Sequence, residues 1–197
     1  MHGIMFAELQ RHVETTLGPE VWPPLLVEAE IPTKIYLPVT SYPDEEFFKL
    51  IEVAAARAGQ DPQNFIEALG EAMAPGLIAT YSALVNPAWK TLDFIENTGT
   101  VIHTIVKRND ANVNPPDLVC IRLSPMELLV SYASERKVCR LARGLIRGVA
   151  NHYHEKILLV EEACMLADPS APKCTFRITV SGPIRRPSTS GFRAVKP

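Results

Sequence analysis

Three side chains with complementary hydrogen-bonding chemistry stand at every second position in the middle of the chain. Tyr132, Ser134 and Arg136 follow the apolar run 126–131, which has the composition of a β-strand. In an extended chain, alternate residues point to the same side, about 6–7 Å from one to the next. Because arginine grips a carboxylate through two parallel hydrogen bonds and hydroxyls can donate to the remaining oxygens, this spacing predicts a site for a doubly anionic ligand. The alternative is a strand end whose surface arginine caps the next helix.

A single histidine, His103, lies in a segment whose apolar residues have helical spacing. If this segment forms one long helix, the imidazole faces the core. It then shares a stripe with Leu92, Ile95, Gly99 and Val106. A buried histidine is either a satisfied hydrogen-bonding group or, as a neutral imidazole, a metal ligand.

In this order and spacing, the motifs resemble those of the heme-nitric oxide/oxygen binding (H-NOX) domains, which are relatives of the heme sensor of soluble guanylate cyclase. Tyr132, Ser134 and Arg136 correspond to the Tyr-x-Ser-x-Arg motif that binds the heme propionates in this family. His103 stands where the family has its proximal histidine, the axial ligand of the heme iron. The resemblance therefore implies a heme b cofactor whose ferrous iron is held in five-coordinate form by His103.

The resemblance covers nearly the whole chain. The opening Met1-His2-Gly3-Ile4 is similar to the start of the family, and residues 136–149 are similar to the helix that follows its motif. We therefore expect a single heme-binding sensor domain over residues 1–183. The polar, turn-rich residues 184–197 are expected to form a disordered tail.

Two further positions have counterparts in the family. Pro116 would press on the macrocycle and distort it, although a proline here can also be a simple turn residue. Asp44 falls near the acidic partner of the motif's arginine, although an aspartate at a helix start is also common in solvent.

Ligand selectivity is expected to depend on the opposite face of the heme. Oxygen-binding members of the family place a tyrosine five residues after the motif's arginine, where this chain has Leu141. The resemblance also implies apolar pocket walls at Ile4, Met5, Met73 and Leu145. Since NO and CO need no hydrogen-bond donor, the ferrous protein is expected to bind both but to form no stable O₂ complex. Tyr81 is a departure, because a rotated helix could bring its hydroxyl into the pocket.

The resemblance also implies a signalling mechanism. NO weakens the iron–imidazole bond on the opposite side, so release of His103 would relax both its helix and the ring distortion maintained by Pro116. The chain contains no kinase, cyclase or phosphodiesterase motif. It is therefore expected not to be an enzyme but to signal to a separate histidine kinase or cyclic-dinucleotide enzyme. A heme peroxidase is disfavoured, since the expected pocket lacks the distal histidine and arginine that cleave a peroxide bond.

A second group of residues has metal-binding chemistry. Some members of the family bind zinc through three cysteines and a histidine, and the corresponding residues here are Cys139, Glu161, Cys164 and Cys174. Glutamate can also ligate zinc, and His152 or His154 could substitute for it. The alternative is three partly buried free thiols. A zinc- or thiol-based redox-sensing module of the same fold is therefore the alternative function.

Composition excludes several other classes of protein. The chain of 197 residues is 47% apolar and 21% charged, which is ordinary for a globular domain. With 20 basic and 22 acidic side chains, it has no positive excess for binding nucleic acid or membrane surfaces. No run reaches the ~18 apolar residues of a membrane span, and the start does not resemble a signal peptide. A cytoplasmic location with reduced cysteines is expected.

Helical segments are expected to precede most of the strands, which indicates an α+β fold. The helical N-terminal part would pack on a C-terminal part with a four-stranded antiparallel sheet, with the heme between them. Gly18 and Gly59 should end two helices, whereas Pro75 and Pro87 should break the pattern before the helix of His103. The expected helices are 2–17, short pieces within 19–30, 44–59, 61–73, the His103 helix and 137–154. The expected strands are 117–123, 126–133, 156–166 and 173–181.

Overall fold

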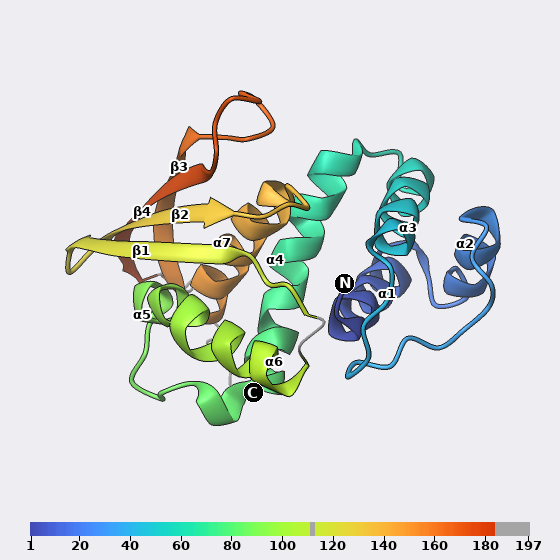
Figure 1. The fold of residues 1–197 in the computed structure, drawn as a ribbon, viewed down its shortest axis with the longest axis horizontal. Helices are drawn as coiled ribbons and strands as arrows, with labels where there is room; N and C mark the ends of the chain where they lie inside the picture. Colours follow the sequence, from blue (N-terminus) through green and yellow to red (C-terminus); the bar gives the residue numbers. More distant parts are fainter. Residues whose placement is uncertain (111–112, 184–197) are drawn as a thin grey trace, which may run out of the picture.

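The structure, a computed structural model, describes residues 1–110 and 113–183. Three short helices gather at one end of the molecule, a sheet with its own helices lies at the other, and a long helix, α4, stands between them (Figure 1). Within these two ranges, no helix combines the length and apolar character needed to cross a membrane. The predicted tail over 184–197 lies outside the described residues.

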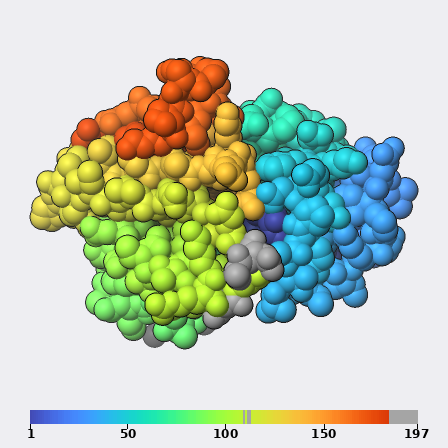
Figure 2. Space-filling model, viewed as in Figure 1, coloured from blue at the N-terminus to red at the C-terminus, as the bar shows by residue number. Residues whose placement is uncertain are grey.

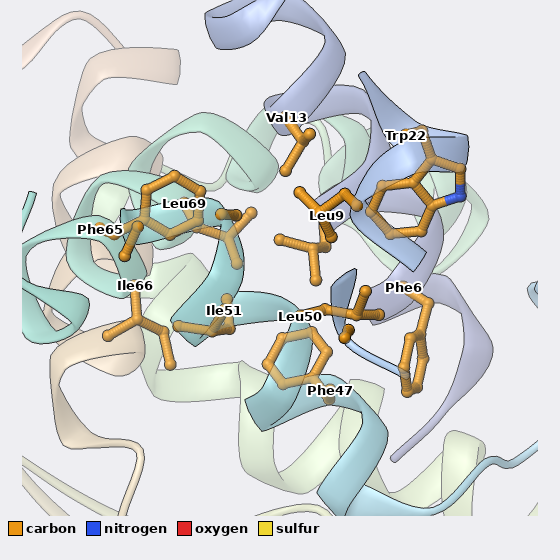
Figure 3. Packing of buried hydrophobic residues seen from close by; sticks show 14 of the residues in the cluster. Phe6, Leu9, Val13, Trp22, Phe47, Leu50, Ile51, Phe65, Ile66 and Leu69 are labelled. Carbon is orange, nitrogen blue, oxygen red and sulfur yellow. The ribbon is translucent and has the colours of Figure 1, made fainter. Parts of the chain in front are cut away.

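The first three helices form what we call the N-terminal lobe, residues 1–61. They are α1 (Gly3–Leu17), α2 (Trp22–Glu28) and α3 (Asp44–Arg57). Their apolar faces meet in a core of fully buried side chains, among them Phe6, Leu9, Phe47 and Leu50, which pack against α4 (Figure 3). Burying one such side chain contributes about 1.5–3 kcal/mol, so this core fixes the position of α1.

Helix α4 (Pro62–Thr80) begins as predicted but ends later. Asp61 caps it by accepting hydrogen bonds from the backbone N–H groups of Gln63 and Asn64, and proline follows at the first helical position. The predicted end near Met73 and the break at Pro75 are wrong, because the helix continues through Pro75 to Thr80. A proline in a helix removes one intrahelical hydrogen bond, and here packing on both sides of α4 outweighs that loss.

Helices α4 and α7 (Cys139–His152) touch backbone to backbone. A β-carbon added to Gly144 would lie 2.0 Å from the carbonyl oxygen of Glu67, and one added to Gly70 would lie 2.4 Å from the carbonyl oxygen of Leu141. Only glycine permits such an approach. This close packing fixes the position of α4 relative to α7, and both helices line the central cavity.

The remaining elements form the C-terminal lobe, residues 82–183. Its helical segments are η1 (Ser82–Leu84), α5 (Thr91–Asn97), η2 (Thr98–His103), α6 (Thr104–Asn109) and α7. Its strands are β1 (Asp117–Ser124), β2 (Glu127–Ala133), β3 (Glu155–Ala163) and β4 (Cys174–Pro183). The four strands pair antiparallel in the order β1-β2-β4-β3, which confirms the predicted α+β class and four-stranded sheet.

The sheet register determines which side chains of β2 face inward. Tyr132 pairs with Leu118 on one side and Cys174 on the other. Along β2, buried residues alternate with partly exposed ones, and Leu128, Val130 and Tyr132 are buried. The last inward position of this strand is therefore the tyrosine of the predicted motif.

Candidate functional site

A cavity of about 260 Å³ lies where the start of α1, the C-terminal end of α4, the α5–α6 segment, α7 and the sheet meet. Figure 2 shows the two lobes meeting along a furrow, in which the dark blue start of the chain is visible. The cavity brings together nine of the ten residues predicted to bind the cofactor: Ile4, Met5, His103, Pro116, Tyr132, Ser134, Arg136, Leu141 and Leu145.

His103 reaches the cavity from a π-helix rather than from the regular α-helix that the sequence predicts. The wider turns of η2 place Thr98 and His103, five residues apart, on the cavity wall. Gly99, which was expected on the stripe of His103, instead packs against β1, where an added β-carbon would lie 3.2 Å from the carbonyl oxygen of Leu118. The hydrophobic pattern could not reveal this extra residue per turn.

The His103 imidazole has the protonation state that a metal ligand needs. Its Nδ1 atom is buried and has no hydrogen-bond partner among residues 1–110 and 113–183. Burial lowers the pKa of His103, and the backbone of Pro116 opposes this effect only in part. The side chain is therefore neutral near pH 7, and a neutral imidazole is the form that binds a metal.

The predicted carboxylate-binding motif leaves β2 at the edge of the cavity. The Tyr132 hydroxyl is buried without a partner in the described part of the chain, and burial raises the pKa of Tyr132 to about 12. The Ser134 hydroxyl oxygen accepts a hydrogen bond of 3.3 Å from the backbone N–H of Arg136. The Arg136 guanidinium donates to Asp44 and to the carbonyl oxygen of Asn114. The arginine is thus held across the site and is not a surface cap.

Asp44 joins the two lobes at this edge. Its carboxylate lies 2.6 Å from Nε of Arg136 and 2.5 Å from the amino group of Met1. Burial alone would raise the pKa of Asp44, but these two cations hold it below its ordinary value. The predicted acidic partner of Arg136 is therefore present in the structure.

The expected apolar wall needs one correction. Met73 does not line the cavity, because its side chain is fully buried in the core of the N-terminal lobe. The face of α4 that meets the cavity carries Ala74, Leu77 and Tyr81, which are three and four residues apart, as on one side of an α-helix. Tyr81 therefore lines the cavity, and burial raises its pKa.

His2 is the residue of this site that the sequence did not reveal. It was predicted only as part of the opening that resembles the family, yet its side chain lines the cavity beside Ser41. The expectation that the pocket lacks a distal histidine able to cleave a peroxide bond stays a prediction. The sequence did contain a signal for His2, because this titratable side chain stands just before the helix that carries Ile4.

The second predicted cluster is also assembled by the fold. One ligand atom each from Cys139, Glu161, Cys164 and Cys174 lies within 4.8 Å of all the others. The Cys139 and Cys164 sulfurs are 3.8 Å apart, which is about the edge of a tetrahedron with zinc–sulfur bonds of about 2.3 Å. Neither His152 nor His154 belongs to this group.

The buried environment of the cysteine cluster favours the neutral thiols over the thiolates. Burial first, and the neighbouring thiols of Cys174 and Cys164 second, raise the pKa of Cys139. Burial also raises the pKa of Cys174, although a hydrogen bond from the backbone of Met165 opposes this effect. Oε1 of Glu161 is buried without a partner among the described residues, while Oε2 lies 3.5 Å from Arg143. Cys120 lies elsewhere, against the carbonyl oxygen of Ile95 and not on the cavity wall.

The donor set of the cavity fits a heme. Apolar side chains form most of its lining, and Tyr132, Ser134 and Arg136 gather at one edge. His103 offers a buried nitrogen that has no partner in residues 1–110 and 113–183. A heme needs these three features: an apolar slot for the macrocycle, an axial base and donors for two carboxylates.

Comparison with known proteins agrees with this geometry. An H-NOX protein from S. oneidensis in the Fe(II)NO ligation state superimposes with a TM-score of 0.85 at 26% identity, covering 92% of this chain and all of that one. The S. oneidensis H-NOX domain in the Fe(II)CO state gives a TM-score of 0.82 at 26% identity, covering 91% of this chain and 98% of that one.

An unliganded Fe(II) H-NOX protein from K. algicida, at 18% identity, shares the fold with a TM-score of 0.80, covering 95% of this chain and all of that one. A search of curated proteins found no match. The family model described as Haem-NO-binding matches residues 2–161. The chain belongs to the Haem-NO-binding, or H-NOX, family.

Proposed function

We propose that the protein is a heme-based gas sensor that binds NO and CO. The observation that carries this proposal is the buried, neutral imidazole of His103, whose Nδ1 atom has no partner among the described residues, in a cavity whose edge holds Tyr132, Ser134 and Arg136. The S. oneidensis relatives in the NO and CO ligation states support it. A heme b in this cavity would supply the iron at which a diatomic gas binds.

The chain's own residues would hold the cofactor at two ends. His103 would provide the axial nitrogen. The motif residues would bind the carboxylates, with Arg136 kept in place by Asp44. Pro116 lines the same cavity, and in this proposal it presses on the macrocycle.

The signal that we propose is release of His103. Helix α5 is anchored to the sheet, because Arg122 of β1 pairs with Asp93 and Glu96 at 2.8 and 2.6 Å. The end of α6 contacts the N-terminal lobe, since the Ser41 hydroxyl donates to Asp110. A change at His103, between these two anchors, would shift one lobe relative to the other. A separate histidine kinase or cyclic-dinucleotide enzyme in the cytoplasm would respond to this shift.

Absorption spectra of the purified protein test the sensor proposal. We expect a Soret band, shifts with NO and CO in the ferrous state, no persistent oxygenated spectrum in air and no turnover of peroxide. A colourless protein that stays colourless after addition of hemin would refute the proposal.

Ligand selectivity has its own test. Leu141 and Leu145 are apolar, whereas Tyr81 also lines the cavity and carries a hydroxyl that could donate a hydrogen bond to bound O₂. A stable oxygenated spectrum in the wild type would refute the predicted exclusion of O₂. If Tyr81→Phe then abolished that spectrum, Tyr81 would be the donor to bound O₂.

A second candidate function, redox sensing, is favoured by the cysteine cluster. Three sulfurs and one carboxylate at tetrahedral spacing fit zinc, and oxidation of the thiols would release it. Metal analysis should find about one zinc per chain, and Cys164→Ser should lower this content. A zinc content near zero in protein purified without chelators would refute the site.

A further inference from the structure

His2 has hydrogen-bonding capacity that the described parts of the chain do not use. The residue precedes α1, its side chain lines the cavity, and its Nδ1 atom is buried without a partner among these residues. Its backbone forms an isolated antiparallel bridge with Ser41. The imidazole is thus held at the cavity by backbone contacts, and its nitrogen is left for another group.

Contacts on one side of His2 lead to the arginine of the motif. The neighbouring amino group of Met1 lies 2.5 Å from Asp44, which in turn lies 2.6 Å from Nε of Arg136. The Arg136 guanidinium also donates to the carbonyl oxygen of Asn114, an exposed residue. His2 therefore lies near the solvent-facing edge of the cavity, where the motif is.

Contacts on the other side of His2 return to the same edge. The Ser41 hydroxyl donates to Oδ2 of Asp110 at 2.8 Å, and Asp110 precedes Asn114 by four residues. The backbone N–H of Val113 donates to the carbonyl oxygen of Asp110, and Val113 and Asn114 both line the cavity. Contacts on both sides of His2 therefore lead to residues at the edge where Arg136 lies.

We propose that His2 is a further binding residue for the carboxylate edge of the cofactor, to which its imidazole donates a hydrogen bond. This inference rests on the proposed function and deepens it, since the Tyr-x-Ser-x-Arg motif does not include this position. His2 would complement Arg136 from the N-terminal lobe, so that each lobe supplies a donor to the same ligand edge.

The charges around His2 determine how this contact depends on pH. Burial lowers the pKa of His2, Asp110 at the end of α6 raises it, and the amino group of Met1 lowers it. Bound carboxylates would favour the imidazolium and raise the pKa. The contribution of His2 to heme retention is therefore fully present at low pH and is lost as the pH rises through the pKa of the bound state.

The test measures the rate of heme loss to excess apomyoglobin. A hydrogen bond to a charged group corresponds to about tenfold to a hundredfold in affinity, so His2→Leu should lose heme faster by about that factor. His2→Gln, which keeps a neutral donor, should show a smaller effect and a weaker pH dependence between pH 6 and 8. His12→Leu is the matched control. His12 lies on α1, the helix that follows His2, but packs edge-to-face on Phe65, away from the cavity.

Hemin dimethyl ester separates a carboxylate contact from any other contact. If His2 binds the carboxylates, His2→Leu and wild type should bind the ester with similar affinity. A His2→Leu effect that persists with the ester, or a rate of heme loss equal to that of wild type, would overturn the proposal. Thermal unfolding of the heme-free variants shows whether His2→Leu has a folding defect. If it does, the rates of heme loss of His2→Gln and wild type are compared instead. A wild type that binds no hemin would instead refute the sensor proposal itself.

Discussion

At the scale of single residues, both candidate sites contain buried polar atoms that have no partner in the described part of the chain. Among the described residues, seven side chains have buried nitrogen or oxygen atoms without a hydrogen bond, and His2, His103, Tyr132 and Glu161 are four of them. An unpaired buried polar atom costs about 1–3 kcal/mol, so proteins rarely retain one without a reason. Their location at the two sites points to ligands for those sites.

His103→Ala is predicted to abolish heme retention, because the variant loses the imidazole that we propose as the iron ligand. His2, the other histidine that lines the cavity, lies at the carboxylate edge. Added imidazole should restore a Soret band by occupying the space that the side chain left. The measurement is heme content per chain with and without imidazole. Retention of wild-type heme content by His103→Ala would show that another residue is the axial ligand.

Residue spacing predicted much of the site, but not all of it. Tyr132, Ser134 and Arg136 could be found because strand alternation is regular over short distances. Met73 was assigned to the wrong face of α4, since a rotation of one residue, about 100°, separates the cavity from the core. His2 was missed because its role depends on Ser41 and Asp110, which only tertiary packing brings close.

At the scale of elements, the helix of His103 shows what an apolar pattern cannot predict. The π-helical turns of η2 change which residues share a face, while the apolar residues alone are compatible with a regular α-helix. Such turns occur often at functional sites. Here they allow His103 to face the cavity while Gly99 packs against β1.

Gly144→Ala is predicted to destabilise the protein by about 1–3 kcal/mol, the usual cost of overpacking. The new methyl group would meet the carbonyl oxygen of Glu67, a backbone atom that cannot move alone. Urea unfolding of the heme-free protein measures this change. Gly76→Ala is the control, because its methyl group would meet only the flexible ends of Glu8 and Arg11. Equal stability of the two variants would contradict close packing of α4 on α7.

At the scale of the whole molecule, three histidines affect how stability depends on pH. Burial is the largest cause that lowers the pKa of His2, of His12 and of His103. Since the unfolded chain then binds more protons, the free energy of unfolding should fall as the pH drops through the ordinary histidine value of about 6.5. Urea midpoints of heme-free protein between pH 7.5 and 5.5 test this. The double variant His2→Gln/His12→Gln should show a flatter dependence, and an unchanged slope would contradict the assignment.

The overall architecture was predictable because its signals are local. Alternating apolar residues indicated the strands, and Gly18, Gly59 and Asp61 marked helix ends where the structure has them. The length of α4 was not predictable, because the pairing of Gly70 and Gly144 that holds it against α7 links residues far apart in sequence.

The pairing of Asp44 with Arg136 has a consequence for biosynthesis. These residues are 92 positions apart, and α7, which closes the same cavity, follows Arg136 in the sequence. A ribosome-bound chain that has made residues 1–110 would therefore contain the proposed axial base, His103, but not the residues proposed to bind the carboxylates. We expect heme to enter only after α7 has emerged, so pigmentation of the protein would report completed synthesis of the domain.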